Sequence, residues 1–589
     1  MVNLKKLLNE KISIVSYIKL DLEKKWVLED SDDEAVSALQ DSLKVSEKLC
    51  NLLVKRNIFT FDDAQDFFRP SLDKLHDPML MKDMDKALER LEVGMRNNEK
   101  ILVYGDYDVD GTTAVSLVYG FFKGFYYNLE HYIPDRYEEG YGVSYQSIDY
   151  SEKNGITLII ALDCGIKAVD KVQYAKDKGI DFIICDHHRP GDTLPNAVAV
   201  LDPKREDCSY PYDELTGCGI GFKLVQAFAA HNDIPFEKVK ALLDLLVVSI
   251  AADIVPITGE NRIMAYYGMQ QLNSEPRPGL RSLIELSGAK RPLKISEIVF
   301  FLAPRINAAG RMDSGQAAVD LLIAQENVSA FLKADTLDVH NKERREIDRS
   351  ITEEALGLIR ENEVLRNKKS IVLYDENWHK GVIGIVASRM IENFYKPSII
   401  LTASDEEFAA GSARSVKGFD IYNAIAVCEP LLEQFGGHKY AAGLTIRREN
   451  IPAFIEQFEQ IVQDTIEEGM LTPEVLVDTA LEVEHMTMNF YKIIEQFEPF
   501  GPSNTKPIFV TYGLNDTGYS SIVGQGGKHL KISASKNGHV INGIAFNQAD
   551  KFDLIKSQPF DVCYSLDLND WRGNTTVQMT IKDIKATQY

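Results

Sequence analysis

Short apolar runs alternate with helix-like segments between residues 100 and 255, and this alternation constrains the fold more than any other feature of the chain. KILVY (100–104), TLIIALD (157–163) and DFIICD (181–186) are rich in β-branched residues and too short for helices. Segments such as GTTAVSLVYGFF and KAVDKVQYAKDKG lie between them and look helical. This βαβ pattern predicts an α/β fold with a parallel sheet covered by helices.

Acidic residues stand at the end of each predicted strand. Asp106, Asp108 and Asp110 follow the first run in the sequence DYDVDG, and the next two runs lead into LDCG and CDHH. We expect a further apolar run, LLVVSIAADIVP, to be a fourth segment of this sheet. Open α/β sheets bind ligands beyond the carboxyl ends of their strands. The pattern therefore predicts one crevice that contains Asp108, Asp110, Asp163, His187 and Asp253.

These side chains indicate metal-dependent phosphoester chemistry. Three carboxylates at alternate positions repel one another, and a divalent cation cancels that repulsion. Carboxylates with one or two imidazoles favour Mn²⁺ or Mg²⁺ over metals that prefer thiolates. Two such cations can clamp a phosphate and the attacking water between them. Taken singly, DYDVDG is also typical of a solvated turn, Asp163 of a helix cap and His-His of a surface or core position. Their combination favours a two-metal hydrolase.

The sequence lacks the signatures of several other enzyme classes. It contains no G-x-x-x-x-G-K-[ST], no G-x-G-x-x-G after a strand and no G-x-S-x-G. These absences argue against a nucleotide kinase and against an α/β-hydrolase.

The composition is that of a large globular protein with an acidic surface. The 589 residues carry a formal net charge of −23, which disfavours a protein that coats nucleic acid but allows a basic channel. Seven cysteines without a C-x-x-C predict a reducing compartment. The sequence shows neither a signal-peptide core nor an apolar stretch long enough for a membrane span. We therefore expect a cytoplasmic protein without membrane contact.

The pattern changes outside this central region. Residues 1–90 and 260–365 are mostly helical, including a long charged helix near 340–365. Residues 369–455 return to an α/β pattern. From Lys506 onward, short strands and an Asn-Gly turn predict a small β-barrel.

DYDVDG, LDCG, DHHRPG and AADIVP occur in the order of the four motifs of the DHH phosphoesterase superfamily. Within it, the chain most resembles the RecJ family of single-strand-specific 5′→3′ exodeoxyribonucleases. Further resemblances lie in APRINAAGRM (303–312), NWHKGVIGIVASR (377–389), GSARS (411–415) and FGGHKYAAG (435–443). LDCG departs from the more usual Asp-Asn-Gly, but it retains Asp163.

This resemblance implies a parallel-sheet DHH domain and a second α/β DHH-associated domain joined by a long helix, with a C-terminal OB-fold β-barrel. The implied divisions are an N-terminal helical segment (1–50), the DHH phosphoesterase domain (51–335), the connecting helix (336–365), the DHH-associated nucleic-acid-binding domain (366–455) and the OB-fold domain with its preceding helices (456–589).

The resemblance also implies roles for individual residues. Two divalent ions, Mn²⁺ in preference to Mg²⁺, would be held by Asp106, Asp108, Asp110, Asp163, His187 and Asp253, with Asp163 bridging both. His188 would face the scissile phosphate, and Asp186 would orient its neighbours. A terminal 5′-phosphate would be bound by Arg136, Ser412 and Arg414. The DNA strand would contact Arg305, Asn307, Arg311, Gly436, Gly437 and His438.

Each of these nucleic-acid contacts has a plainer alternative. Arg136 is also typical of a surface salt bridge with Glu138 or Glu139. GSARS is compatible with a turn, and Gly436-Gly437 with a glycine cap at a helix boundary. The segment from Arg305 to Arg311 is compatible with a helix start packed on the sheet.

The implied activity is two-metal hydrolysis of single-stranded DNA from the 5′ end, releasing 5′-mononucleotides, in DNA recombination and repair. Expected partners are a helicase and a single-strand-binding protein, and the expected state is a monomer. Two alternatives are a DHH-family oligoribonuclease or cyclic-dinucleotide phosphodiesterase, and a non-catalytic DHH replication scaffold. The long C-terminal region argues against the first, and the intact acidic residues and His187 argue against the second.

Overall fold

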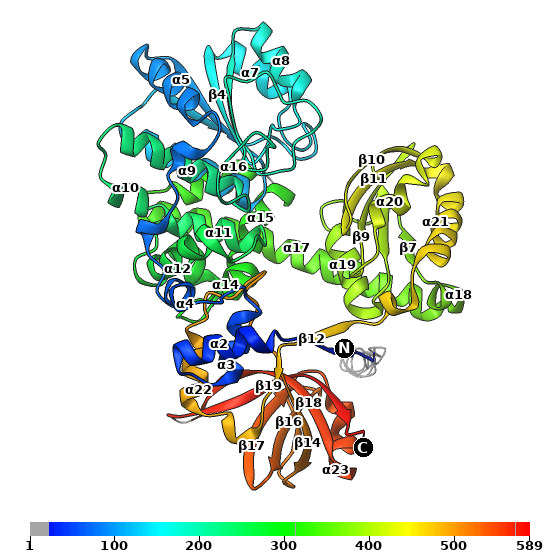
Figure 1. The fold of residues 1–589 in the computed structure, drawn as a ribbon. Coiled ribbons are helices and arrows are strands. Elements are labelled where there is room, and N and C mark those ends of the chain that lie inside the picture. Colours follow the sequence, from blue (N-terminus) through cyan, green and yellow to red (C-terminus); the bar gives the residue numbers. More distant parts are fainter. Residues whose placement is uncertain (1–22, 313, 572, 589) are drawn as a thin grey trace. The chain divides into compact units, whose positions relative to one another are not determined.

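The computed structural model describes residues 23–312, 314–571 and 573–588 (Figure 1). Much of the predicted N-terminal helical segment, residues 1–22, lies outside this range. The chain forms two compact units. One contains Arg344–Leu476 with residues 23–27, and the other contains Leu28–Glu343 and Val477–Tyr589. No helix in the described part of the chain is long and apolar enough to cross a membrane.

The larger unit contains the predicted parallel sheet. Its five strands are all parallel in the order β3-β2-β4-β5-β6. The strands are β2 (Lys100–Gly105), β3 (Leu129–Tyr132), β4 (Ile156–Leu162), β5 (Asp181–Cys185) and β6 (Ala199–Leu201). Three of them match the apolar runs in the sequence to within one or two residues.

The two faces of this sheet bury different helices because successive side chains point to opposite sides. Val103 and Ile160 pack into a large core with helices α5 (Met84–Arg96), α6 (Val109–Lys123) and α9 (Gly217–His231). Leu102 and Ile159 pack into a smaller core with α7 (Tyr145–Lys153) and α8 (Val169–Asp177). The sheet is therefore the middle layer of three.

One predicted strand is a helix. LLVVSIAADIVP forms α11 (Leu243–Ala252), and Asp253 is its C-cap. Residues 243–251 are buried on every side, which explains the absence of an amphipathic pattern. A short apolar run bounded by turns does not distinguish a buried strand from a buried helix. Asp253 therefore reaches the site from a helix end and not from the sheet.

Helices follow α11 as far as the second unit. They are α12 (Gly259–Ser274), α13 (Pro278–Ser287), α14 (Ile295–Glu297), the π-helix η3 (Ile298–Leu302), α15 (Ala303–Met312), α16 (Gly315–Leu322) and α17 (Asn327–Glu361). The predicted long charged helix is α17, and it begins earlier than its charged segment suggested.

The smaller unit is built on a five-stranded mixed sheet in the order β10-β11-β9-β8-β7. Its strands are β7 (Ile371–Tyr374), β8 (Ser398–Ala403), β9 (Phe408–Arg414), β10 (Leu432–His438) and β11 (Ala441–Arg447). Its helices include α18 (Glu363–Asn367), α19 (Ile383–Phe394), α20 (Ile421–Ala426) and α21 (Ile451–Thr465). The predicted return to an α/β pattern is confirmed.

The C-terminal strands close into a barrel. They run in the order β13-β14-β18-β19-β17-β16-β15, and an additional β14–β16 pairing completes the closure. The strands are β13 (Thr479–Ala480), β14 (Phe509–Asp516), β15 (Ser521–Val523), β16 (His529–Lys536), β17 (His539–Ala545), β18 (Phe560–Trp571) and β19 (Asn574–Ala586), with α22 (Met488–Glu495) and α23 (Phe552–Ser557). The predicted Asn537-Gly538 hairpin joins β16 to β17.

The N-terminal helices share their core with this barrel. Buried residues of α2 (Asp33–Leu43) and α3 (Glu47–Val54) form one hydrophobic cluster with the barrel strands, and Phe67 and Phe68 of α4 (Phe61–Phe68) pack against it. The N-terminal segment also contains a strand, β1 (Lys25–Leu28), which pairs with β12 (Glu474–Val477).

Three of the predicted domain divisions fall inside helices. The division at 50/51 lies within α3, the one at 335/336 within α17 and the one at 455/456 within α21. The buried residues of α3 and of α21 each belong to one hydrophobic core, whereas α17 contributes buried residues to one core in each unit.

Candidate metal centre

The DYDVDG segment forms the turn between β2 and α6. Asp108 is the N-cap of α6, and its Oδ1 accepts a hydrogen bond from the Gly111 amide at 3.0 Å. A Cβ on Gly111 would lie 2.3 Å from the Asp106 carbonyl oxygen, so only glycine allows this close approach. The turn thereby holds Asp106 and Asp110, both buried, at one end of the sheet.

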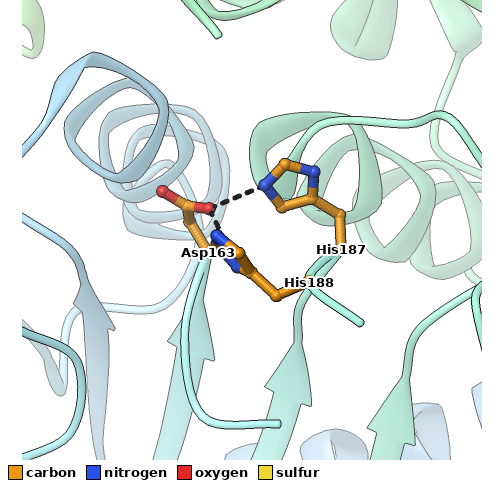
Figure 2. A group of neighbouring side chains, drawn as sticks. All are labelled: Asp163, His187 and His188. Atoms are coloured by element: carbon orange, nitrogen blue, oxygen red, sulfur yellow. Dashed lines mark ion pairs between the residues drawn. The ribbon is translucent and has the colours of Figure 1, made fainter. Parts of the chain in front are cut away.

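The next two strands deliver Asp163 and the Asp186-His187-His188 segment to the same end. Asp163 follows β4 in the left-handed conformation with φ 59°, which is uncommon for a non-glycine residue. His187 Nε2 lies 3.1 Å and His188 Nδ1 lies 4.0 Å from Asp163 Oδ1. Figure 2 shows the two imidazoles directed at the same carboxylate. Strained backbone of this kind clusters at functional sites.

Two further carboxylates surround His187. Asp110 Oδ2 and Asp253 Oδ2 each lie 3.7 Å from His187 Nε2. The amides of Gly217 and Cys218 donate to Asp110 at 2.7 and 2.9 Å, and the Ser249 hydroxyl donates at 2.7 Å. Asp110 is thus fixed by the start of α9 and the middle of α11.

These residues form three overlapping groups whose ligand atoms lie within 4.8 Å of one another. The groups are Asp106, Asp108 and Asp163; Asp163, His187 and His188; and Asp110, His187 and Asp253. Several of their buried atoms lack a hydrogen-bond partner, namely Asp106 Oδ1, Asp163 Oδ1 and both ring nitrogens of His187. Buried polar atoms in native proteins are normally paired. Unpaired oxygens and imidazole nitrogens at this spacing fit a pair of divalent cations.

The electrostatics of the cluster lead to the same conclusion. Burial first, and then neighbouring carboxylates, raise the pKa of Asp106, Asp108 and Asp163. The same causes raise the pKa of Asp253 to about 8. Burial lowers the pKa of His187, which keeps its imidazole neutral and able to bind a metal. A set of carboxylates that repel one another is stabilised by cations.

His188 has a different environment from His187. Its Nδ1 lies 2.8 Å from Asp186 Oδ1, and although burial alone would lower its pKa, this carboxylate raises it. Asp186 also accepts hydrogen bonds from three amides, those of Ile166, His187 and His188. Burial would raise the pKa of Asp186, but the hydrogen bond from His188 and these amides hold it below its usual value. Asp186 thus fixes the orientation and the charge of His188.

Comparison with known proteins places this cluster in a family. The sequence model of the DHH family, N-terminal domain, matches residues 100–250, that of the DHHA1 domain matches 367–464, and that of the RecJ OB domain matches 477–583. The single-stranded-DNA-specific exonuclease RecJ of Bacillus subtilis strain 168 is 34% identical over 570 residues, covering 96% of this chain and 71% of the relative.

The chain belongs to the RecJ family.

Further matches agree with this assignment. Escherichia coli K12 RecJ is 32% identical over 525 residues, covering 85% of this chain and 90% of that protein. The crystal structure of RecJ in complex with Mn²⁺ from Thermus thermophilus has a TM-score of 0.83 and 25% identity, covering 96% of this chain and 80% of that one. The predicted fold class, a parallel-sheet DHH domain, a DHH-associated domain and an OB-fold barrel, is confirmed.

Sequence reasoning missed several residues that shape this RecJ-family site. Gly217 lies against Asp163, and a Cβ there would be 2.5 Å from the Asp163 Cβ. Ser249 stands four residues before Asp253, and its hydroxyl donates to Asp110. The Tyr141 hydroxyl lies 3.2 Å from His188 Nε2. Glycine and serine carry no chemical signature in a single sequence.

The predicted DNA-binding residues of α15 differ in their surroundings. Asn307 and Arg311 are half-buried, and the carbonyl oxygen of Arg311 accepts a hydrogen bond from the Tyr137 hydroxyl. The prediction that Arg305 contacts the DNA strand is corrected. Its side chain is buried, and its Nε lies 2.8 Å from Asp338 Oδ1 on α17. A buried guanidinium needs a carboxylate partner, and this pairing takes Arg305 away from a DNA path.

Arg136 lies in the same unit, next to the acidic turn. Its guanidinium carbon is 5.0 Å from the centre of the Tyr107 ring, and no carboxylate among the described residues forms an ion pair with it. The alternative salt bridge with Glu138 or Glu139 is therefore absent from the described part of the chain. Glu139 instead accepts hydrogen bonds from the Tyr132 hydroxyl and the Asp135 amide.

The smaller unit contains the remaining predicted residues. Ser412 and Arg414 lie in β9, and Arg414 Nη1 donates to Ser412 Oγ at 3.1 Å. Burial lowers the pKa of Arg414, and no carboxylate of the described residues offsets it. A Cβ on Gly384, in the first turn of α19, would lie 2.9 Å from Ser412 Oγ and 3.0 Å from Arg414 Nη2. This half-buried arginine, held beside a glycine and a hydroxyl, is suited to an anion.

Gly436, Gly437 and His438 lie in β10, which is an edge strand, and all three are exposed. They do not cap a helix, so that alternative is wrong. Gly437 has φ 144°, and a Cβ there would lie 2.4 Å from the Ala441 carbonyl oxygen. An exposed glycine edge leaves backbone groups accessible to a sugar–phosphate chain.

Proposed function

We propose that this protein is a single-stranded-DNA-specific exonuclease that hydrolyses DNA in the 5′→3′ direction and releases 5′-mononucleotides. The observation that carries this proposal is the convergence of buried carboxylates and His187, with unpaired ligand atoms, at one end of a parallel sheet. RecJ relatives named as single-stranded-DNA-specific exonucleases match most of the chain, and one was crystallised with Mn²⁺.

We assign the metal ligands on the grouping of their atoms. Asp106, Asp108 and Asp163 would hold one ion, and Asp110, His187 and Asp253 the other, with Asp163 between them. When bound, two Mn²⁺ or Mg²⁺ ions supply the Lewis acidity that activates water and neutralises a phosphate. The hydrogen bonds to Asp110 fix its orientation, which is the usual role of groups behind a metal ligand.

His188, although its Nδ1 lies near Asp163, would act on the phosphate, and Asp186 would act through His188. The raised pKa of His188 favours its protonated imidazole, whose Nε2 can donate to a phosphate oxygen as charge develops. Asp186 supports that charge at Nδ1. Water attacks the phosphorus of the first internucleotide bond, the 3′-oxygen of the terminal nucleotide leaves, and the phosphate stays on the shortened strand.

Recognition of a terminal phosphate explains the polarity. Ser412 and Arg414 offer a hydroxyl and a guanidinium without a carboxylate partner, and Arg136 offers a second such guanidinium. A monoester carries more charge and less bulk than an internal diester, so a guanidinium without a carboxylate partner favours the 5′ end.

The strand itself would contact Asn307, Arg311, Gly436, Gly437 and His438. The barrel adds a groove of about 570 Å³ whose lining includes Lys531, Asn542 and Phe546. One lysine, several amides and an exposed aromatic ring suit the stacking and backbone contacts that single strands make with OB-folds. We propose that this groove holds the trailing strand.

We keep the location, oligomeric state, partners and domain division that the sequence predicted. All seven cysteines are free, which supports a reducing cytoplasmic location. We propose a monomer that acts in recombination and repair with a helicase and a single-strand-binding protein. We also keep the five-part domain division, with its boundaries moved to the ends of α3, α17 and α21.

The decisive experiment compares wild type with Asp163→Asn on single-stranded DNA that carries a 5′-phosphate, a 5′-hydroxyl or a blocked 5′ end. The wild type should release mononucleotides from the phosphorylated end only in the presence of Mn²⁺ or Mg²⁺. Asp163→Asn should lose on the order of 10³-fold in rate while strand binding remains, because the positioned charge stabilises the transition state. Unchanged digestion after removal of metal, or release from the 3′ end, would contradict the proposal.

A further inference from the structure

A cavity of about 210 Å³ opens beside His188. Its walls include Tyr141 and Gly142 on one side and the turn Gly165–Ala168 after β4 on the other. Two lysines line it, Lys167 in that turn and Lys171 in the first turns of α8. The cavity therefore adjoins His188, where the proposed scissile phosphate would lie.

The cavity lies at one end of a row of side chains that begins at Arg136. The Arg136 guanidinium packs on the Tyr107 ring, whose centre is 6.4 Å from that of Tyr141. The Tyr141 ring centre is in turn 6.1 Å from that of His188. Tyr141 and His188 line the cavity, whereas Arg136 and Tyr107 do not. If Arg136 binds the terminal phosphate and His188 the scissile one, the cavity lies on the 3′ side of the bond.

The charges within the cavity suit a phosphodiester. Lys171 is half-buried and Lys167 exposed, and neither forms an ion pair or hydrogen bond with a described residue. Asp186 also lines the cavity, but amides and His188 occupy both of its oxygens. A half-buried lysine without an ion-pair partner among the described residues offers positive charge to a phosphodiester.

We propose that this cavity, with Lys171 as its principal contact, binds the second internucleotide phosphate, the one that follows the scissile bond. This inference rests on the proposed function. After each cut the scissile phosphate becomes the new 5′-phosphate, and the strand advances by one nucleotide. The phosphate held by Lys171 then moves to His188. The cavity thus holds the phosphate of the next bond to be cut. Tyr141 lines the cavity beside His188, and its exposed ring offers a face on which a base can stack.

The test uses short 5′-phosphorylated substrates and full-length protein. A dinucleotide has one internucleotide phosphate and a trinucleotide has two. Lys171→Ala should lower kcat/KM for the trinucleotide about tenfold, the expected effect of a charge-assisted hydrogen bond, and that for the dinucleotide less than about twofold. Lys171→Arg should restore most of the trinucleotide activity. On long strands Lys171→Ala should reduce the salt dependence of binding by about one charge.

The matched control is Lys176→Ala, which removes the same charge from the same helix but away from the cavity, where Lys176 donates to Asn196. Lys176→Ala should change kcat/KM for the dinucleotide and for the trinucleotide by the same factor. Replacing the second internucleotide phosphate by a neutral methylphosphonate should lower the wild-type kcat/KM about as much as Lys171→Ala does. Combining the two changes should lower it little further. Equal losses on both substrates, or additive losses from the two changes, would overturn the proposal. Absence of wild-type 5′ hydrolysis would instead refute the proposed function.

Discussion

At the scale of single residues, the geometry around Asp163 depends on a neighbour without a side chain. Gly217 begins α9, its amide donates to Asp110, and its α-carbon faces the Asp163 side chain. Asp163 itself has φ 59°. Two constraints, a strained backbone and a close glycine, therefore hold one carboxylate in place.

Gly217→Ala should lower exonuclease activity about 100-fold, because displacing a catalytic group by about 1 Å has an effect of that size. The new Cβ would lie 2.5 Å from the Asp163 Cβ and 2.7 Å from its Cα, so Asp163 must move. Steady-state rates with Mn²⁺ measure the loss, and circular dichroism reports the fold. Gly219→Ala, in the same turn of the same helix, is the control, since its nearest neighbour would lie at 3.4 Å. Equal activity of the two variants would show that Asp163 does not need this contact.

The carboxylates could be predicted at this scale, and their supports could not. Asp108 and Asp163 stand out because charge directly after a buried apolar run requires an explanation. Ser249 does not stand out, because a serine inside an apolar helix has no evident role in the sequence. Only the structure shows that its hydroxyl lies 2.7 Å from Asp110 Oδ1. Arg305 was misread for the opposite reason, because a sequence does not show whether an arginine faces solvent or a buried carboxylate.

At the scale of secondary-structure elements, the sheet was predictable and the helix α11 was not. Strands β2, β4 and β5 are predicted by short runs of β-branched residues, each of which ends next to an acidic residue. α11 contains a run of equally apolar residues, and only its packing against α6, α9 and α12 makes it helical. Its C-terminal end nevertheless brings Asp253 to the site, 3.7 Å from His187 Nε2.

The contact between α15 and α17 supplies a prediction at this scale. Arg305→Met should destabilise the protein by about 3 kcal/mol, because it leaves Asp338 buried with only the exposed Lys342 as a partner. Chemical unfolding measures the change. Adding Asp338→Asn to Arg305→Met should recover part of the loss. If Arg305 instead contacted DNA, the single variant would bind strands more weakly without losing stability.

At the scale of the whole molecule, a chain of net charge −23 concentrates buried carboxylates in one centre. The pKa values of Asp106, Asp108, Asp163 and Asp253 are all raised in the fold. Between the unfolded pKa near 4 and the folded values, the native state without metal binds more protons than the unfolded chain. Its stability therefore falls as the pH rises.

We expect the Tm of the metal-free protein to fall between pH 6 and pH 8, the region in which Asp253, with a pKa of about 8, begins to ionise. Mn²⁺ should reverse this trend, because it binds the ionised carboxylates, so the Tm gain from metal should be larger at pH 8 than at pH 6. Differential scanning calorimetry measures both. Asp253→Asn should flatten the metal-free profile, and a metal-free Tm that rises over this interval would contradict the assignment.

The shared core of α2, α3 and the barrel has a consequence for synthesis. Arg56 donates a hydrogen bond to Asn504, 448 residues later. At about 5–20 residues per second, roughly 20 to 90 s separate the emergence of these two residues from the ribosome. The apolar face of α2 and α3 stays uncovered for that time, whereas the DHH sheet can close as soon as its own strands have left the exit tunnel. Among the described helices, α2 and α3 are translated first and yet complete their core late, so we expect this segment to depend on a chaperone during synthesis.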